Sequence, residues 1–131
     1  MEKKVLGIHH IALRAKDFDK TIAFYTQVLG FTHYLGWGDP GRRIALLDVG
    51  DGTRMEVFEA DYTEPQGGFW HLALNVPDPD GLYAAALEAG CTEHIAPKDA
   101  LLKGEFELPV RLAFVKGLSG EILEFFHPLE G

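Results

Sequence analysis

Residues 8–14 read Ile8-His9-His10-Ile11-Ala12-Leu13-Arg14, and residues 69–75 read Phe69-Trp70-His71-Leu72-Ala73-Leu74-Asn75. The two stretches are versions of each other, because each places a histidine before a run of alternating apolar and small residues. The spacing is constant: His71 follows His10 by 61 positions (71 − 10), and Asp78 follows Asp17 by 61 positions (78 − 17). Each stretch then runs into a helix-like segment that ends in a glycine. The sequence therefore predicts one structural unit that occurs twice.

The first half of the chain predicts a strand, a helix and three further strands. Residues 5–15 alternate and are rich in β-formers, which is typical of a strand. Asp17 is a candidate N-cap for a helix with an apolar stripe, and Gly30 suits the left-handed position after it. The stripe consists of Phe18, Ile22, Tyr25 and Leu29. The three further strands are expected at residues 31–36, 42–49 and 54–60.

The second half repeats this order. A strand is expected at residues 69–76, and Pro77-Asp78-Pro79-Asp80 opens a helix that Gly90 ends. Further strands are expected near residues 91–96, 110–116 and 121–127. Residues 97–109 carry the least pattern and suit an active-site flap or a plain loop. Each half, about 5–60 and 68–128, thus predicts the order βαβββ in a single α+β domain.

Size, charge and cysteine content limit the classes of function. A chain of 131 residues that is 47% hydrophobic fits one globular domain and not a disordered protein. The net charge of −8 and the pI near 5.1 argue against nucleic-acid binding, which needs a basic surface. No apolar run approaches the ~20 residues of a membrane span, and Met1-Glu2-Lys3-Lys4-Val5 lacks the apolar region of a signal peptide. We therefore expect a cytoplasmic protein without nucleic-acid or membrane partners, whose single Cys91 is a buried structural thiol.

Strand alternation predicts which side chains share a face of the sheet. One face of the first strand carries His10, Ala12 and Arg14. The same face of its repeat carries His71, Ala73 and Asn75. The opposite face, expected beneath the helices, carries His9, Ile11 and Leu13 in the first strand and Trp70, Leu72, Leu74 and Val76 in the repeat. Because each histidine on the first face is followed there by a small alanine, that face leaves room for a ligand.

Each half closes with a strand that carries a glutamate among apolar residues. These strands contain Met55-Glu56-Val57-Phe58 and Leu123-Glu124-Phe125-Phe126. A carboxylate in such surroundings is costly to bury unless it is paired or metal-bound. Two His and two Glu at corresponding positions of a repeat therefore predict a metal site, made of His10, Glu56, His71 and Glu124. Phe58 and Phe126 would form its apolar walls, and the donors suit Zn, Ni, Fe(II), Co or Mn.

The pattern resembles the vicinal oxygen chelate (VOC) superfamily, also called the glyoxalase/bleomycin resistance/extradiol dioxygenase superfamily. The matching stretches are His10-Ile11-Ala12-Leu13, Phe24-Tyr25 before Leu29-Gly30-Phe31, His71-Leu72-Ala73-Leu74 and Gly120-Glu121-Ile122-Leu123-Glu124-Phe125. The resemblance covers essentially the whole chain. It implies two βαβββ modules that form an open, curved mixed sheet with a metal-lined cleft. It also implies a homodimer, because a short chain of this family usually dimerises.

Carried over residue by residue, the family's four ligand positions fall on His10, Glu56, His71 and Glu124. This full set of two His and two Glu is most similar to glyoxalase I, the lactoylglutathione lyase. The similarity implies one divalent metal per site, Zn or Ni first, with Fe, Co or Mn as alternatives. Such a metal stabilises the enediolate that forms when an α-hydroxycarbonyl or hemithioacetal substrate loses a proton. Glu124, with Glu56 as its counterpart, is the expected base that moves the proton between adjacent carbons.

Four residues are candidates for contact with the substrate. Arg14 matches a basic position of the family, and we expect Arg111 to assist it, with Phe58 and Phe126 as apolar contacts. Glyoxalase I enzymes of this type tend to carry an Asn for glutathione contact a few residues after the first Glu. Here Glu59-Ala60-Asp61 follows instead, and its two negative charges suit an anionic tripeptide poorly.

Two other functions remain open from the sequence. An Fe(II) dioxygenase of the extradiol type uses two His and one Glu, and it predicts that Glu56 is dispensable for metal binding. A protein of the bleomycin-resistance type would sequester a small molecule or drug in an apolar groove without turnover. That type generally lacks the metal ligands, so the complete set of four favours a lyase or isomerase.

Overall fold

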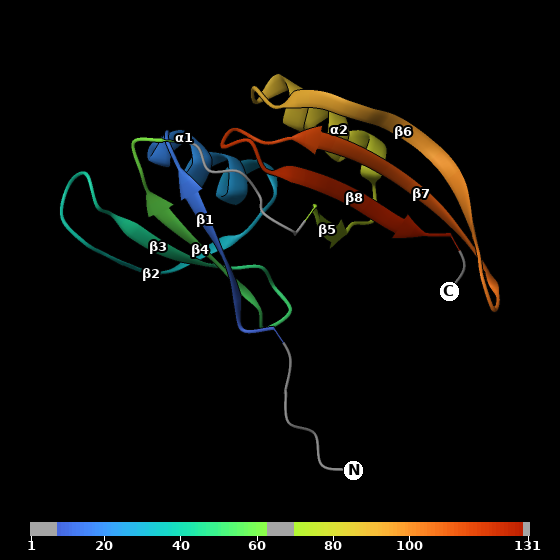
Figure 1. Cartoon of the computed structure of the whole chain (residues 1–131), viewed down its shortest axis with the longest axis horizontal. Coiled ribbons are helices and arrows are strands. Elements are labelled where there is room, and N and C mark those ends of the chain that lie inside the picture. The colour runs from blue at the N-terminus through green and yellow to red at the C-terminus, as the bar shows by residue number, and fades with distance from the viewer. Residues whose placement is uncertain (1–7, 63–69, 130–131) are drawn as a thin grey trace, which may run out of the picture. The chain divides into compact units, whose positions relative to one another are not determined.

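A computed structural model describes residues 8–62 and 70–129 of the chain. The chain divides into two compact units, residues 1–63 and 64–131, and each unit is considered by itself. Both contain a strand, a helical segment and three more strands (Figure 1). The expected order βαβββ is therefore confirmed in each half.

The first unit holds a four-stranded mixed sheet. Its elements are β1 (His10–Ala15), α1 (Phe18–Ala23), the π-helical η1 (Phe24–Val28), β2 (Thr32–Trp37), β3 (Ile44–Asp48) and β4 (Arg54–Glu59). The strand order across the sheet is β1-β4-β3-β2. Strands β1 and β4 run parallel, whereas β4, β3 and β2 form an antiparallel meander. This parallel pairing brings the first and the last strand of the unit together.

The second unit has the same topology. Its elements are β5 (Leu72–Asn75), α2 (Pro79–Glu88), β6 (Thr92–Lys103), β7 (Glu107–Lys116) and β8 (Ile122–Pro128). The strand order is β5-β8-β7-β6, with β5 parallel to β8 and the remaining pairs antiparallel. The α+β class and the mixed pairing are thus as expected, and the strands form two sheets, one in each unit.

Local sequence signals account for the start and end of each helix. The Asp17 carboxylate accepts a hydrogen bond from the backbone N–H of Lys20 at 3.1 Å, and the Asp78 carboxylate accepts one from Gly81 at 3.1 Å. Each carboxylate satisfies a backbone donor that the first helical turn leaves without a partner. Gly30 follows the first helical segment with φ of 81° and Gly90 the second with φ of 109°, a region that glycine adopts without steric cost.

The first helix differs from the expected continuous α-helix. Regular α-helix ends at Ala23, and the chain continues to Val28 as a π-helix. The Thr26 hydroxyl donates to the backbone carbonyl of Ile22 at 2.8 Å within this stretch. A side chain that occupies a backbone carbonyl in this way competes with the regular hydrogen-bond ladder, which agrees with the change of helix type there.

The expectation of a loop or flap over residues 97–109 is wrong. Strand β6 continues to Lys103 and β7 begins at Glu107, so that the two strands form a long hairpin. Pro97, which suggested a loop, lies where the register between the strands shifts between Ile95 and Lys98. Strand β6 is the edge of its sheet, where a proline without an N–H donor is tolerated at a bulge.

Alternation along the strands places buried apolar side chains under the helix of each unit. In the first unit, Met55 and Val57 of β4 are buried, and in the second Leu123 and Phe125 of β8 are fully buried, as expected. Helix α2 contacts β6, β7 and β8. Two residues depart from the expectation. Trp70 precedes β5, lies outside the alternating strand and is 64% exposed, and Ile11 of β1 is 39% exposed. The faces that carry Glu56 and Glu124 are therefore those turned away from these buried apolar residues.

Cys91 is buried, in agreement with a structural thiol. Within residues 8–62 and 70–129, no helix is long and apolar enough to cross a membrane.

Candidate functional site

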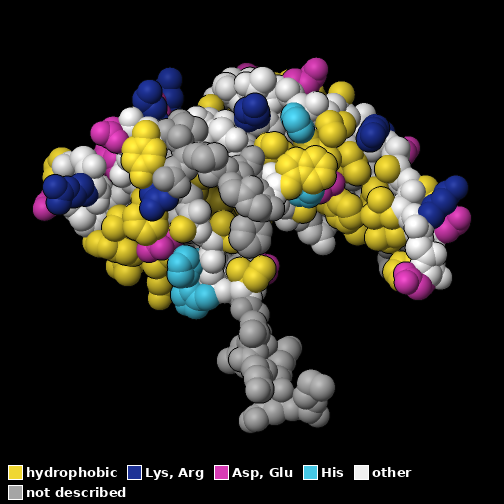
Figure 2. Space-filling model, in the orientation of Figure 1, with side chains coloured by type: hydrophobic (Ala, Val, Ile, Leu, Met, Phe, Trp, Pro, Cys, Tyr) yellow, Lys and Arg dark blue, Asp and Glu magenta, His cyan; other side chains and the backbone are white. Residues whose placement is uncertain are grey.

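The first unit brings His10 and Glu56 together. The parallel pairing of β1 with β4 places Ala12 opposite Glu56, and His10 lies on the same face because it precedes Ala12 by two positions. Nε2 of His10 lies 3.4 Å from Oε1 of Glu56, and the two side chains are 40% and 16% exposed. Histidine side chains reach the surface in both units (Figure 2). This first half-site is therefore a histidine–carboxylate pair that solvent can reach.

The second unit repeats the pair with His71 and Glu124. Strand β5 runs parallel to β8 and places Ala73 opposite Glu124, the same register as in the first unit. Nε2 of His71 lies 3.0 Å from Oε1 of Glu124, and the two side chains are 24% and 9% exposed. The equivalence that the sequence repeat indicated for these four residues thus holds in their local geometry.

The second half-site is the less solvated of the two, and Glu124 shows the effect. Burial raises the pKa of the Glu124 carboxyl above its usual value, because removal from water disfavours the charged form. The neighbouring His71 opposes this shift through its charge and hydrogen bond. A carboxyl whose pKa is raised by burial and lowered by a neighbouring histidine is suited to accept and release a proton, which is typical of a catalytic position.

Aromatic side chains pack around the second pair. Phe114 lies opposite Glu124 in the pairing of β7 with β8, and its ring meets the His71 ring edge to face, with centroids 5.1 Å apart. Phe126 packs against the buried cluster of Val110, Leu112 and Phe114. Phe126 therefore belongs to the same face of the sheet as Glu124, which is where the expected apolar wall would lie.

The donor atoms of both pairs fit a metal ion. In neither unit do the described residues gather three or more His, Cys, Asp or Glu side chains into one metal-binding group, so each unit supplies two donors. Two donors bound to one metal at about 2.1 Å are separated by roughly 3.0 Å at a right angle and roughly 3.4 Å at a tetrahedral angle. The two His–Glu distances, 3.4 Å and 3.0 Å, have these values. In addition, Nδ1 of His71 is buried without a hydrogen-bond partner among the described residues, so the contact that the structure gives this ring with a polar group is that of Nε2 with Glu124.

A pocket of about 440 Å³ lies beside the first half-site. It is lined by Arg14, Gly41, Phe58, Glu59, Ala60, Asp61 and Tyr62. Arg14 and Phe58 lie opposite each other in the pairing of β1 with β4, two positions beyond Ala12 and Glu56. The structure therefore brings Arg14 and Phe58 together on the face of the His10–Glu56 pair.

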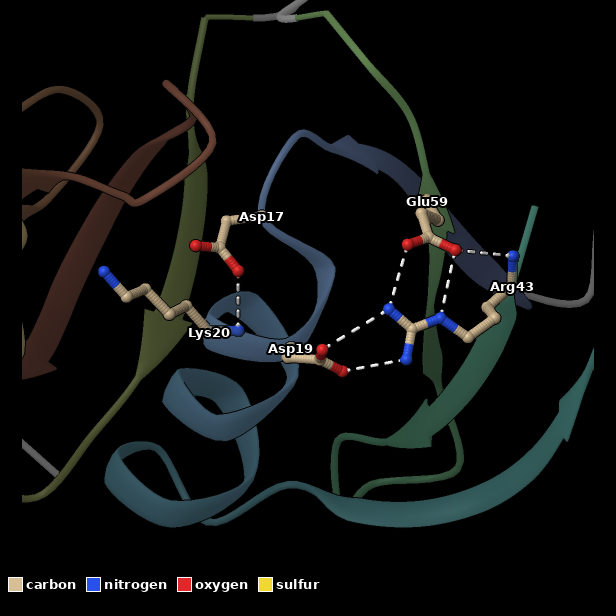
Figure 3. Close-up of polar contacts among 5 residues, drawn as sticks. All are labelled: Asp17, Asp19, Lys20, Arg43 and Glu59. Carbon is tan, nitrogen blue, oxygen red and sulfur yellow. Dashed lines mark hydrogen bonds and ion pairs between the residues drawn. The ribbon is translucent and has the colours of Figure 1, made fainter. Parts of the chain in front are cut away.

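The charge of Glu59 within this pocket is already compensated by Arg43. Its Oε2 lies 2.9 Å from Nη2 of Arg43, whose Nη1 reaches Asp19 of α1 at 2.9 Å (Figure 3). The hydrogen bond from Arg43 lowers the pKa of Glu59 to about 2. Sequence reasoning counted Glu59 and Asp61 as two negative charges at the substrate position. Since Glu59 is engaged by Arg43, Asp61 is the one of these two carboxylates whose charge this ion pair does not compensate.

Arg111 is not brought to the His71–Glu124 pair. Alternation along β7 places it on the face opposite Phe114, where Nη2 lies 2.8 Å from Asp80 of α2 and Nη1 lies 3.3 Å from Asp99 of β6. In this position Arg111 ties the helix to the sheet. A contact between Arg111 and a substrate stays a prediction.

Sequence reasoning missed one residue at the first half-site. Nδ1 of His9 lies 2.9 Å from Nδ1 of His10, although alternation assigned His9 to the opposite face. The rule fails here because β1 begins at His10, so that His9 lies outside the regular strand. Only the adjacent pair of histidines in the sequence hinted at this contact.

Comparison with known proteins agrees with this architecture. The family model described as Glyoxalase/Bleomycin resistance protein/Dioxygenase superfamily matches residues 7–108. The chain belongs to this superfamily. It is 29% identical over 126 residues to a protein named probable lactoylglutathione lyase from Vibrio cholerae, covering 89% of this chain and 87% of that protein.

Two further proteins are similar to the chain, one in sequence and one in fold. A 2-epi-5-epi-valiolone epimerase from an Actinomyces species is 28% identical over 99 residues, which are 57% of this chain and 54% of the epimerase. The match thus spans about half the length of that relative. A mutant of glyoxalase I from Zea mays has a similar fold, with a TM-score of 0.73 and 23% identity over 93% of this chain and 47% of that one.

Proposed function

We propose that this protein is a metal-dependent lyase or isomerase of the glyoxalase type. The observation that carries the proposal is the repeated pair, His10 with Glu56 and His71 with Glu124, in the same register and at metal-donor spacing. The names of the two curated relatives, a lyase and an epimerase, support an enzyme over a protein that only binds.

The four donors would hold one divalent cation, Zn or Ni first, with Fe, Co or Mn as alternatives. Two imidazoles and two carboxylates suit these borderline metals better than Mg or Ca, which prefer oxygen donors alone. When bound, such a cation polarises the oxygens of an α-hydroxycarbonyl or hemithioacetal and favours loss of the proton on the adjacent carbon. The donors would come from one chain or from the two copies of a homodimer.

Glu124 is the proposed base, with Glu56 as its symmetric counterpart. The Glu124 carboxylate would take the proton from one carbon of the substrate and return it to the neighbouring carbon. Burial supports this role for Glu124, because a desolvated carboxylate gains more from binding a proton than a hydrated one. Glu56, which is more exposed, would mainly hold the cation.

The pocket beside the first half-site is the proposed place for the rest of the substrate. Arg14 supplies a cation and Phe58 an aromatic face within it. Because Arg43 compensates Glu59, an anionic substrate group near Arg14 meets less repulsion than the sequence suggests. Phe126 would contribute apolar contact beside Glu124.

Metal analysis is the first test of this proposal. Tag-free protein, its Glu56→Gln variant and a His33→Phe control would be analysed by inductively coupled plasma mass spectrometry and chelator competition. About one Ni, Zn or Co per site, bound more weakly by Glu56→Gln and unchanged by the control, is the expected result. Iron that survives Glu56→Gln would favour the dioxygenase instead. Absence of metal after reloading would favour a sequestering protein and remove the proposed site.

Turnover and assembly complete the test. Metal-loaded protein would be assayed with the hemithioacetals of methylglyoxal and with α-hydroxyketones, following solvent deuterium exchange at the carbon next to the carbonyl. Exchange that is lost in Glu124→Gln supports proton transfer by this carboxylate. Sedimentation velocity with and without metal would show whether the proposed homodimer forms and whether it accompanies metal binding.

A further inference from the structure

His9 and His10 are joined through their rings. The two Nδ1 atoms lie 2.9 Å apart, and the rings meet edge to face with centroids 5.2 Å apart. Two nitrogens at this distance share a hydrogen bond, so one of them carries a proton and the other accepts it. Nε2 of His10, on the opposite side of the same ring, faces Glu56.

The direction of this hydrogen bond is linked to what His10 presents to Glu56. When His10 donates from Nδ1, its neutral ring has a lone pair at Nε2, which is the form that binds a cation. When His9 donates, Nε2 of neutral His10 carries the proton and can donate it to the Glu56 carboxylate. His9 can take either part, because a neutral imidazole has one donor and one acceptor that exchange between the ring nitrogens.

We propose that His9 is a positioning residue for His10. It holds the ring through Nδ1 in both forms and keeps Nε2 directed at Glu56, so that a cation can replace the proton between them without reorientation of the ring. The identity of that cation rests on the proposed function, whereas the ring contact of His9 does not.

The second half-site supports the inference by contrast. Trp70 precedes His71 as His9 precedes His10, and an indole offers a donor but no acceptor. The His71 ring packs against Trp70 and Phe114, with centroid distances of 4.9 and 5.1 Å. Packing thus orients His71, the less exposed of the two histidines. His10 has a more exposed side chain, 40% against 24% for His71, and depends on a hydrogen bond for its orientation.

Long-range ¹H–¹⁵N spectra of the imidazole rings test the contact in metal-free protein. Wild-type His10 is expected to show an Nδ1 chemical shift displaced by hydrogen bonding, and His9→Phe should remove that displacement. His9→Asn should restore the displaced Nδ1 shift, because the amide offers both an acceptor and a donor close to the position of Nδ1. His71 is the internal control and should give the same spectrum in all three proteins. An unchanged His10 spectrum in His9→Phe would overturn the proposal.

Metal affinity, measured by competition with a chelator, tests the consequence. Loss of a partner that orients a ligand weakens metal binding by about 10–100-fold, and this is expected for His9→Phe. His9→Asn should recover most of the affinity, and His33→Phe, which removes an exposed histidine of β2, should leave it unchanged. Equal affinity in wild type and His9→Phe would overturn the proposal. If wild type binds no metal, the proposed function fails, and the spectra alone decide the role of His9.

Discussion

Ala12 of β1 lies directly opposite Glu56 of β4 in the parallel pairing of these strands. The second unit places Ala73 opposite Glu124 in the same way. Residues paired in this register share one face of the sheet, so on the side of β1 or β5 each carboxylate has only a methyl group beside it. Small side chains at these positions leave space above the His–Glu pairs.

Enlarging Ala12 should therefore block the site without unfolding the protein. Ala12→Leu adds bulk beside Glu56, where it would crowd a bound cation, and crowding of this kind costs about 1–3 kcal/mol of binding free energy. Metal affinity is expected to fall by roughly tenfold to a hundredfold. The size-matched control is Ala12→Ser, which should bind as wild type does in the same chelator competition. Because Ala12 is exposed, the unfolding midpoint should not change, and full metal affinity in Ala12→Leu would contradict the assignment.

Glu124 and its neighbour Leu123 should respond to substitution in opposite ways. Glu124→Gln removes a buried charge at constant size, so turnover should fall by about 10²–10⁴-fold, the usual contribution of a general base, with no loss of stability. Leu123→Ala empties a fully buried position and should cost about 2–5 kcal/mol of unfolding free energy. Paired assays of turnover and urea unfolding check both. Destabilisation by Glu124→Gln on the scale of Leu123→Ala would indicate a structural carboxylate.

Arg111 and Asp80 should behave as a single structural contact. Arg111→Met and Asp80→Asn are each expected to lower the thermal midpoint, since each breaks the connection of β7 to α2. The double variant should be little worse than either single one, because the second change finds the contact already lost. A raised KM for Arg111→Met with an unchanged thermal midpoint would instead support a contact between Arg111 and the substrate.

Part of the loss of folding stability in acid should come from protonation of Glu59. Because Arg43 lowers the folded-state pKa of Glu59 to about 2 from a usual 4.5, the pair stabilises the protein fully above the usual pKa. That stabilisation is lost as the pH falls from about 4.5 through about 2. Chemical unfolding of wild type and Glu59→Gln between pH 6 and pH 2, done with chelator, should give stabilities that converge toward the acid end. Glu105→Gln, at the hairpin tip, controls for the loss of one charge. A constant difference at all pH values would contradict this role.

The thiol of Cys91 should be unreactive in the folded protein. Burial raises its pKa to about 11, with a smaller contribution from the charge of Glu121, and a protonated thiol is a poor nucleophile. Reaction with a chromogenic disulfide reagent at pH 8 should be slow in native protein and fast in denaturant. The chain has a single cysteine, so the signal reports this thiol alone. Rapid labelling of native protein would show that the site opens.

Much of the fold follows from local patterns. The N-caps at Asp17 and Asp78 and the glycines at 30 and 90 act on their own helix ends, so their roles are readable from a few neighbouring residues. Period-two alternation likewise separated Glu56 from its buried neighbours. The β6–β7 hairpin escaped prediction because strand pairing, rather than local propensity, holds residues 97–103 extended.

The sequence by itself determined the repeat, and with it the four candidate ligands and the faces on which they lie. Tertiary structure alone decided which partners meet: Glu59 with Arg43, Arg111 with Asp80, and His9 with His10. The physical reason is the distance along the chain over which each kind of interaction acts. Periodicity and capping depend on residues within a turn or two, whereas an ion pair depends on distant segments that pack together, and a ring contact depends on where regular strand geometry begins.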